Sequence, residues 1–169
     1  SVWDVPVGKG RRYVSSGVLS RVVEGWQLSP IFTAMSGLPF TPGINGNPAN
    51  TTGGVRPDRL ADGNLPRSQR TPERWFDPAA FAVPGQFRFG TSGQNVLVGP
   101  GAVNLDLMAG RTVRFGERFR LDFRAEFFNL LNEAHFLFPT ATVNVANAGQ
   151  ISQTADAARQ IQFGLKLLF

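Results

Sequence analysis

Four charged residues of alternating sign occupy every second position of one short stretch: Arg120, Asp122, Arg124 and Glu126. At this spacing their side chains would share one face of an extended strand, because successive side chains point to opposite sides. Such a row could bind a polar solute or pair with another polar part of a protein. Alternatively, the opposite charges satisfy one another as a ladder that keeps one face wet, at roughly a few tenths of a kcal/mol per pair. The sequence leaves both interpretations open.

The residues between these charges are apolar. From 119 to 127 every odd position carries Phe, Leu or Ala. A strict period of two predicts a strand, because a helix would scatter the charges around its circumference. We predict this strand over 118–131, well beyond the roughly five or six residues of a usual soluble strand. It covers the roughly 9–11 tilted residues that a strand needs to cross a bilayer.

Similar alternation predicts four more strands, over 1–7, 25–35, 103–115 and 159–169. A tight reversal at Gly116 and Glu117 joins the third of these to 118–131 as a long hairpin. Pro30 weakens the prediction for 25–35, because proline lacks the donor that a ladder needs. The fold class is therefore all-β and antiparallel.

Two long segments, 36–98 and 132–158, lack this periodicity and are rich in turn residues. We predict both to be loops. The first contains one hydrophobic cluster, around Trp75, Phe76 and Phe81. Because long loops often carry function, these three residues are candidates for an external binding surface; the alternative is a lid or an ordinary variable loop.

Several kinds of chemistry have no support in the sequence. The chain has no cysteine, which excludes disulfides, thiolate metal sites and a cysteine nucleophile. Its one histidine, His135, lacks partners at the spacing that a metal ion or a general base requires. Gly99-Pro100-Gly101 and Gly8-Lys9-Gly10 lack the rest of the known nucleotide-binding motifs. We expect no enzyme, no cofactor and no metal. The net charge of +5 is spread among acidic residues and loops, so we expect no nucleic acid either.

The order of the connections favours a membrane barrel. No window of the sequence is apolar for long enough to form a transmembrane helix. Outer-membrane barrels alternate short periplasmic turns with long external loops. Counting back from a periplasmic C-terminus places 132–158 outside, the turn at 115–117 inside, 36–98 outside and 8–24 inside. Five strands cannot close, since roughly eight form the smallest barrels. The chain would therefore be one part of a barrel wall, or would complete the wall with other copies.

In such a wall the two faces of each strand have different surroundings. The row from Arg120 to Glu126 would face the lumen and contact a plug or a solute. The apolar side chains would face lipid, and those expected to do so are Phe119, Leu121, Phe123, Phe127, Ile161, Phe163, Leu165 and Leu167.

The sequence resembles the C-terminal end of TonB-dependent outer-membrane receptors, in particular the Oar-like subgroup. The matching stretches are Gly-Trp-Gln-Leu-Ser with Ser-Gly-Leu-Pro-Phe-Thr (25–29, 36–41), Trp-Phe-Asp-Pro-Ala-Ala-Phe (75–81), Gly-Pro-Gly-Ala-Val-Asn-Leu-Asp-Leu (99–107), Phe-Arg-Ala-Glu-Phe-Phe-Asn-Leu-Leu-Asn (123–132) and Arg-Gln-Ile-Gln-Phe-Gly-Leu-Lys-Leu-Leu-Phe (159–169). Each stretch alone is weak, but their order and spacing make the match fairly specific.

The resemblance implies a location in the bacterial outer membrane and a closed barrel of about 22 strands around a plug. It implies uptake of a bulky solute with energy from the inner-membrane TonB complex. The implied partners are membrane lipid, the remainder of the barrel, the plug, the TonB complex and the barrel-assembly machinery, for which Phe169 would be the C-terminal signal. A soluble all-β binding or adhesion module, with the same strands folded over a core, is the alternative.

Overall fold

The computed structural model describes residues 2–5 and 24–169, which form two compact units. The sheet unit comprises Val103–Glu133, Ala157–Phe169 and the described part of Ser1–Ala34. The loop unit comprises Met35–Ala102 and Ala134–Asp156. Nearly all of the predicted connection over 8–24, and part of the predicted strand over 1–7, lie outside the described residues.

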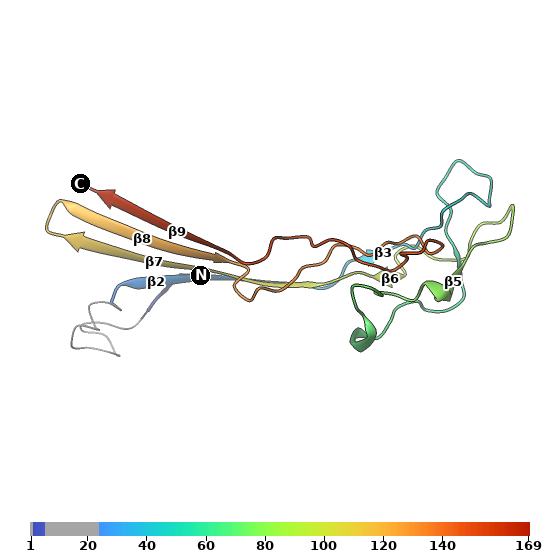
Figure 1. Cartoon of the computed structure of the whole chain (residues 1–169), viewed down its shortest axis with the longest axis horizontal. Coiled ribbons are helices and arrows are strands. Elements are labelled where there is room, and N and C mark those ends of the chain that lie inside the picture. Colours follow the sequence, from blue (N-terminus) through green and yellow to red (C-terminus); the bar gives the residue numbers. More distant parts are fainter. Residues whose placement is uncertain (1, 6–23) are drawn as a thin grey trace. The chain divides into compact units, whose positions relative to one another are not determined.

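The sheet unit is a single open sheet in which strands follow one another in chain order. The order is β1-β2-β7-β8-β9, and every neighbouring pair with a defined register is antiparallel. The last four of these strands are labelled in Figure 1. Their bounds are β1 Trp3–Asp4, β2 Trp26–Met35, β7 Ala102–Phe115, β8 Phe119–Phe128 and β9 Gln160–Leu168. The predicted all-β class is confirmed. Four strands lie at predicted ranges with small changes at their ends, whereas β1 covers only two residues of the strand predicted over 1–7. Pro30 lies within β2 without ending it.

The hairpin of β7 and β8 has the tight reversal that the sequence predicts. Phe115 lies opposite Phe119, so the turn consists of residues 116–118. Gly116 has a φ of 63° in this turn, a conformation that glycine adopts without steric cost. The register pairs odd positions with odd positions across β7, β8 and β9, as for Val113, Leu121 and Leu167. One face of the sheet is therefore apolar and the other is polar across all three strands.

The strand predicted over 118–131 ends at Phe128, three residues early. Asn129 has a φ of 51°, which takes the chain out of the extended conformation. Its backbone N–H donates to Asp106 Oδ1 at 2.9 Å. Its side chain binds both the backbone N–H and the carbonyl of Glu133, at 3.0 and 2.8 Å. Asparagine side chains commonly compete with a ladder in this way, which explains the earlier end.

The loop unit has more structure than the prediction of two loops allowed. It contains β3 (Pro39–Phe40) paired with β6 (Leu97–Val98), and β4 (Asp58–Arg59) paired with β5 (Phe81–Ala82). Two short 3₁₀ helices, Arg67–Gln69 and Pro78–Ala80, accompany them. The described residues contain no α-helix, and no helix among them is long and apolar enough to cross a membrane.

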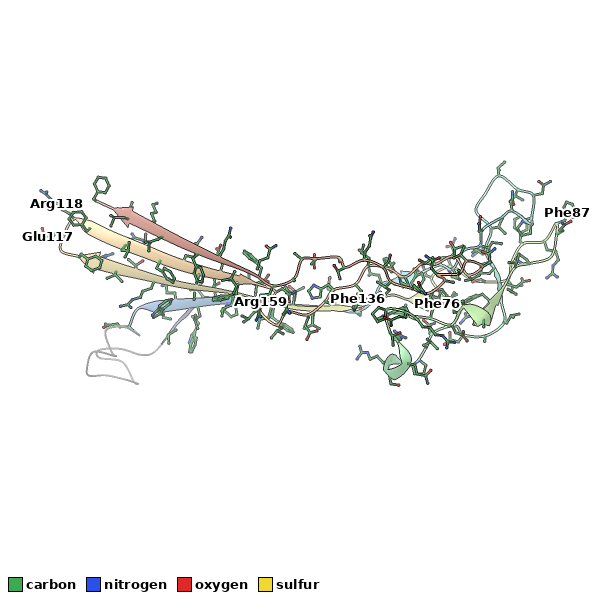
Figure 2. The ribbon with its side chains drawn as sticks, viewed as in Figure 1. Phe76, Phe87, Glu117, Arg118, Phe136 and Arg159 are labelled. Carbon is green, nitrogen blue, oxygen red and sulfur yellow. The ribbon has the colours of Figure 1, made fainter. Side chains whose placement is uncertain are left out.

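The two predicted loops also fold together as one body. Backbone N–H groups of Gly43, Trp75 and Ile151 donate to carbonyls on the other segment, at 2.7–3.0 Å. A small core of Phe76, Ala80, Phe81 and Leu97 supports the unit. Figure 2 labels Phe76 within it. Strands of two residues have no sequence period, so alternation could not reveal this unit.

Gly90 provides a test of how tightly the loop unit is packed. A Cβ at this position would overlap the carbonyl oxygens of Arg56 and Pro57, both of them backbone atoms. We expect Gly90→Ala to destabilise the loop unit by about 1–3 kcal/mol, as overpacking does. Gly53→Ala is the matched control, because a Cβ there meets nothing within 4 Å. The measurement is the rate of limited proteolysis between residues 36 and 98; equal rates in the two variants would contradict the packing.

Candidate functional site

The charged row predicted on β8 lies on the polar face of the sheet and forms two ion pairs. Arg120 Nε donates to Asp122 Oδ1 at 2.8 Å, and the same oxygen accepts a 2.7 Å hydrogen bond from the Thr112 hydroxyl of β7. Arg124 Nη1 lies 3.5 Å from Glu126 Oε1. Within the row, then, the opposite charges satisfy one another in part, as the ladder interpretation expects.

These pairs add little stability. The Arg120 and Arg124 side chains are about half exposed or more, and exposed pairs of this kind contribute roughly 0.2–1 kcal/mol. The row thus keeps one face of the sheet hydrated, while its arginines retain donors that a ligand can use.

A hollow of about 650 Å³ lies over the polar face. It is bordered by four strands or their ends, and Arg120, Asp122 and Arg124 are among its lining residues. Gln27 of β2 and Lys166 of β9 extend the lining to the strands on either side of the hairpin. The structure therefore brings three of the four predicted polar residues together at one concave site. The other lining residues are Gly25, Met108, Gly110, Thr112 and Gly164, together with Arg111, Phe123 and Leu165, which belong to the apolar face by register.

The predicted lipid-facing residues lie on the opposite face, and most of them are exposed. Phe163 and Leu165 on β9 are 69% and 70% exposed. Phe123 lies between two aromatic neighbours, in an edge contact with Trp26 at 5.8 Å and stacked on Phe163 at 6.3 Å between ring centres. The side chains that the sequence predicts on the apolar face therefore lie on one face of the sheet. That they contact lipid stays a prediction for the residues Phe119, Leu121, Phe123, Phe127, Ile161, Phe163, Leu165 and Leu167.

One charge interrupts the apolar face. Arg111 lies on β7 directly opposite Phe123, four residues before the end of the strand at the turn. A long arginine side chain can lay its stem along an apolar surface while its charged end reaches a polar boundary.

The prediction of an external aromatic surface at Trp75, Phe76 and Phe81 needs correction. Phe76 and Phe81 are buried in the core of the loop unit, where they contact each other edge to face. Trp75 is partly exposed, and its indole N–H donates to the Val98 carbonyl at 2.9 Å while Arg70 lies over its ring. Phe76 and Phe81 are apolar because they form a core. Of the three residues, only Trp75 has a surface that a ligand could contact.

His135 has a partner that the sequence did not reveal. Its ring is buried, and Nδ1 lies 2.9 Å from Asp156 Oδ2. The Ala155 N–H also donates to the His135 carbonyl at 2.7 Å. The two partners are 21 residues apart in a segment without periodicity, so no local signal could pair them. Among the described residues no group of acidic, histidine or cysteine side chains could hold a metal ion.

Phe169 follows β9 and is 95% exposed. It continues the odd-numbered apolar positions of this strand. Its role as a signal for the assembly machinery stays a prediction.

Comparison with known proteins identifies a family. A family model described as "Outer membrane beta barrel domain" matches residues 1–162 of the chain. No curated protein and no solved structure matches.

Proposed function

We infer the function from one premise: this chain belongs to the family of outer membrane β-barrel domains, and it therefore lies in the bacterial outer membrane, in contact with membrane lipid. We propose that it forms the last strands and external loops of a TonB-dependent receptor, which takes up a bulky solute. The soluble-module alternative does not fit this location.

One observation carries the proposal. The sheet has an apolar face whose large side chains remain exposed, and an opposite face with ion pairs and a hollow. Lipid would cover the first face, while a water-filled lumen would hydrate the second. Because lipid provides no hydrogen bonds, the open edges at β1 and β9 require further strands. The remainder of the receptor barrel would supply them.

The order of the motifs supports the finer assignment. The stretches that resemble TonB-dependent receptors occur at 25–29 with 36–41, 75–81, 99–107, 123–132 and 159–169. Four of them supply parts of β2, β7, β8 and β9, and the stretch 75–81 supplies most of the core of the loop unit. A plug and the TonB complex would then be partners of the whole receptor.

The predicted orientation can be tested with single cysteines, since the chain has none of its own. Figure 2 labels Phe87 in the loop unit and Glu117 in the turn of the hairpin, and both residues are exposed. A membrane-impermeant maleimide should label Phe87→Cys on intact cells, and should label Glu117→Cys only after lysis. Labelling of both, or of Glu117→Cys alone, on intact cells would contradict the orientation.

Energy coupling needs a separate test. The whole natural protein, purified in detergent, should bind the periplasmic domain of TonB, as measured by calorimetry. A barrel that inserts normally but shows no such binding would contradict the receptor assignment and leave the barrel assignment intact.

A further inference from the structure

Two glycines flank one arginine in the middle of the polar face. Arg124 on β8 lies directly opposite Gly110 on β7 and Gly164 on β9. Glycine weakens the interior of a strand, and it often marks a place where a ligand or another backbone approaches closely. A row of glycine, arginine and glycine therefore calls for an explanation.

The fold itself does not require either glycine. Neither has a positive φ. A Cβ at Gly110 would meet nothing nearer than 3.4 Å, and one at Gly164 nothing nearer than 3.9 Å, so both would make ordinary contacts. Neither backbone conformation nor packing excludes a larger residue at these positions. What the glycines provide is open space on both sides of Arg124.

The charges around this space favour an anion. Arg120, Arg124 and Lys166 line the hollow from the polar face against a single carboxylate, Asp122. Asp122 already accepts hydrogen bonds from Arg120 and Thr112. The contact from Arg124 to Glu126, at 3.5 Å, is longer than the 2.7–3.2 Å of an ordinary N–H···O bond, and the Arg124 side chain is 62% exposed. Its guanidinium group is therefore available to a ligand.

We propose that the hollow binds an anionic group, such as a carboxylate, phosphate or sulfate, carried by a solute in the lumen. The Arg124 guanidinium binds two oxygens of the group in its planar fork, and Lys166 supplies a second positive charge. Gly110 and Gly164 leave the room that the group occupies. This inference rests on the proposed function, because only in a barrel does the polar face line a lumen.

The test uses inorganic phosphate as the probe and follows its ³¹P NMR signal at low salt, with the whole natural protein in detergent micelles. Arg124→Gln should weaken binding about tenfold or more, as the loss of a charged hydrogen-bond partner does. Gly110→Val and Gly164→Val should weaken it to a similar extent, because they fill the hollow and leave every charge in place. Arg114→Gln is the matched control, since it removes the same charge from the polar face outside the hollow. It should leave binding within about twofold.

Two results would overturn the proposal. The parent protein could fail to bind phosphate, which would mean that the hollow takes no anion or is occupied by another part of the protein. The two glycine variants could bind phosphate as well as the parent does, which would mean that diffuse positive charge attracts the anion. Protease protection of the same samples in lipid vesicles tests insertion separately. If the parent protein inserts normally but does not bind phosphate, this inference is wrong and the proposed function still stands.

Discussion

Phe123→Arg is expected to lower the stability of the membrane-inserted protein by about 2–4 kcal/mol if residue 123 lies near the midplane of the bilayer. Phe123 is central on the apolar face, between Trp26 and Phe163. A charge there would lie in hydrocarbon, which cannot solvate it. Equilibrium unfolding by urea from lipid vesicles measures the difference, and the fraction that resists protease in the vesicles confirms insertion.

Gln162→Arg is the matched control for this experiment. Gln162 lies on β9 opposite Glu126, and thus on the polar face of the same sheet. The added charge would remain hydrated beside a carboxylate, so we expect a change of at most about 0.5 kcal/mol. If Phe123→Arg inserts and unfolds like the parent chain, residue 123 does not face lipid.

Phe76→Ala is expected to destabilise the loop unit by about 3–5 kcal/mol, the usual range for removing a buried phenylalanine. Phe76 is 1% exposed and contacts both Phe40 and Phe81 edge to face. Its loss would leave a cavity at the centre of the core. Native-state proteolysis between residues 36 and 98, with the fragments identified by mass, measures the opening free energy.

Phe87→Ala serves as the control for Phe76→Ala. Phe87 belongs to the same unit but is 78% exposed, so its truncation should change the opening free energy by less than about 0.5 kcal/mol. Indistinguishable cleavage rates in the two variants would mean that the segment is a loop without a core, as the sequence had suggested.

The sheet could be predicted because its signal is local and long. Residues 119–127 of β8 alternate without a break, and the apolar side of β9 shows the same period. Within the sheet each strand pairs with the next strand of that sheet along the chain, although long segments separate β2 from β7 and β8 from β9. The faces followed directly from the alternation, and the register of the hairpin joins them into one apolar surface and one polar surface.

The loop unit could not be predicted, because its structure depends on contacts between distant segments. Gly43 pairs with residues 141–143, and His135 with Asp156. Composition gave turns and one hydrophobic cluster, but it could not tell a core from an exposed binding surface. Phe76 and Phe81 illustrate the error, since a buried and an exposed phenylalanine look alike in a sequence without a period.

The hollow on the polar face could be recognised only from the sequence pattern and the strand register together. The sequence identified Arg120, Asp122 and Arg124 as neighbours on one face of a strand. Only the register between strands brings Gly110 and Gly164 beside Arg124 and sets Lys166 opposite Asp122. The sequence pattern alone did not indicate a role for the two glycines, because their effect depends on Arg124, which lies opposite them on the neighbouring strand.

If the chain were a soluble module, the apolar side chains of the sheet would have different surroundings. A water-soluble module would cover Phe163, Leu165 and their neighbours with a second layer. In the described part of the chain these side chains remain exposed. Together with the family, this favours lipid as what covers them.

The most direct test is a scan of reagent accessibility along β8 in bilayers. Single cysteines at each position from 119 to 128, which are unique in this chain, would carry a spin label. We predict that labels at odd positions such as 121, 123 and 127 collide with oxygen dissolved in the lipid, and that labels at 122, 124 and 126 collide with a water-soluble nickel complex. Odd positions that are shielded from both reagents would mean that these side chains lie inside a protein core, and would contradict the account.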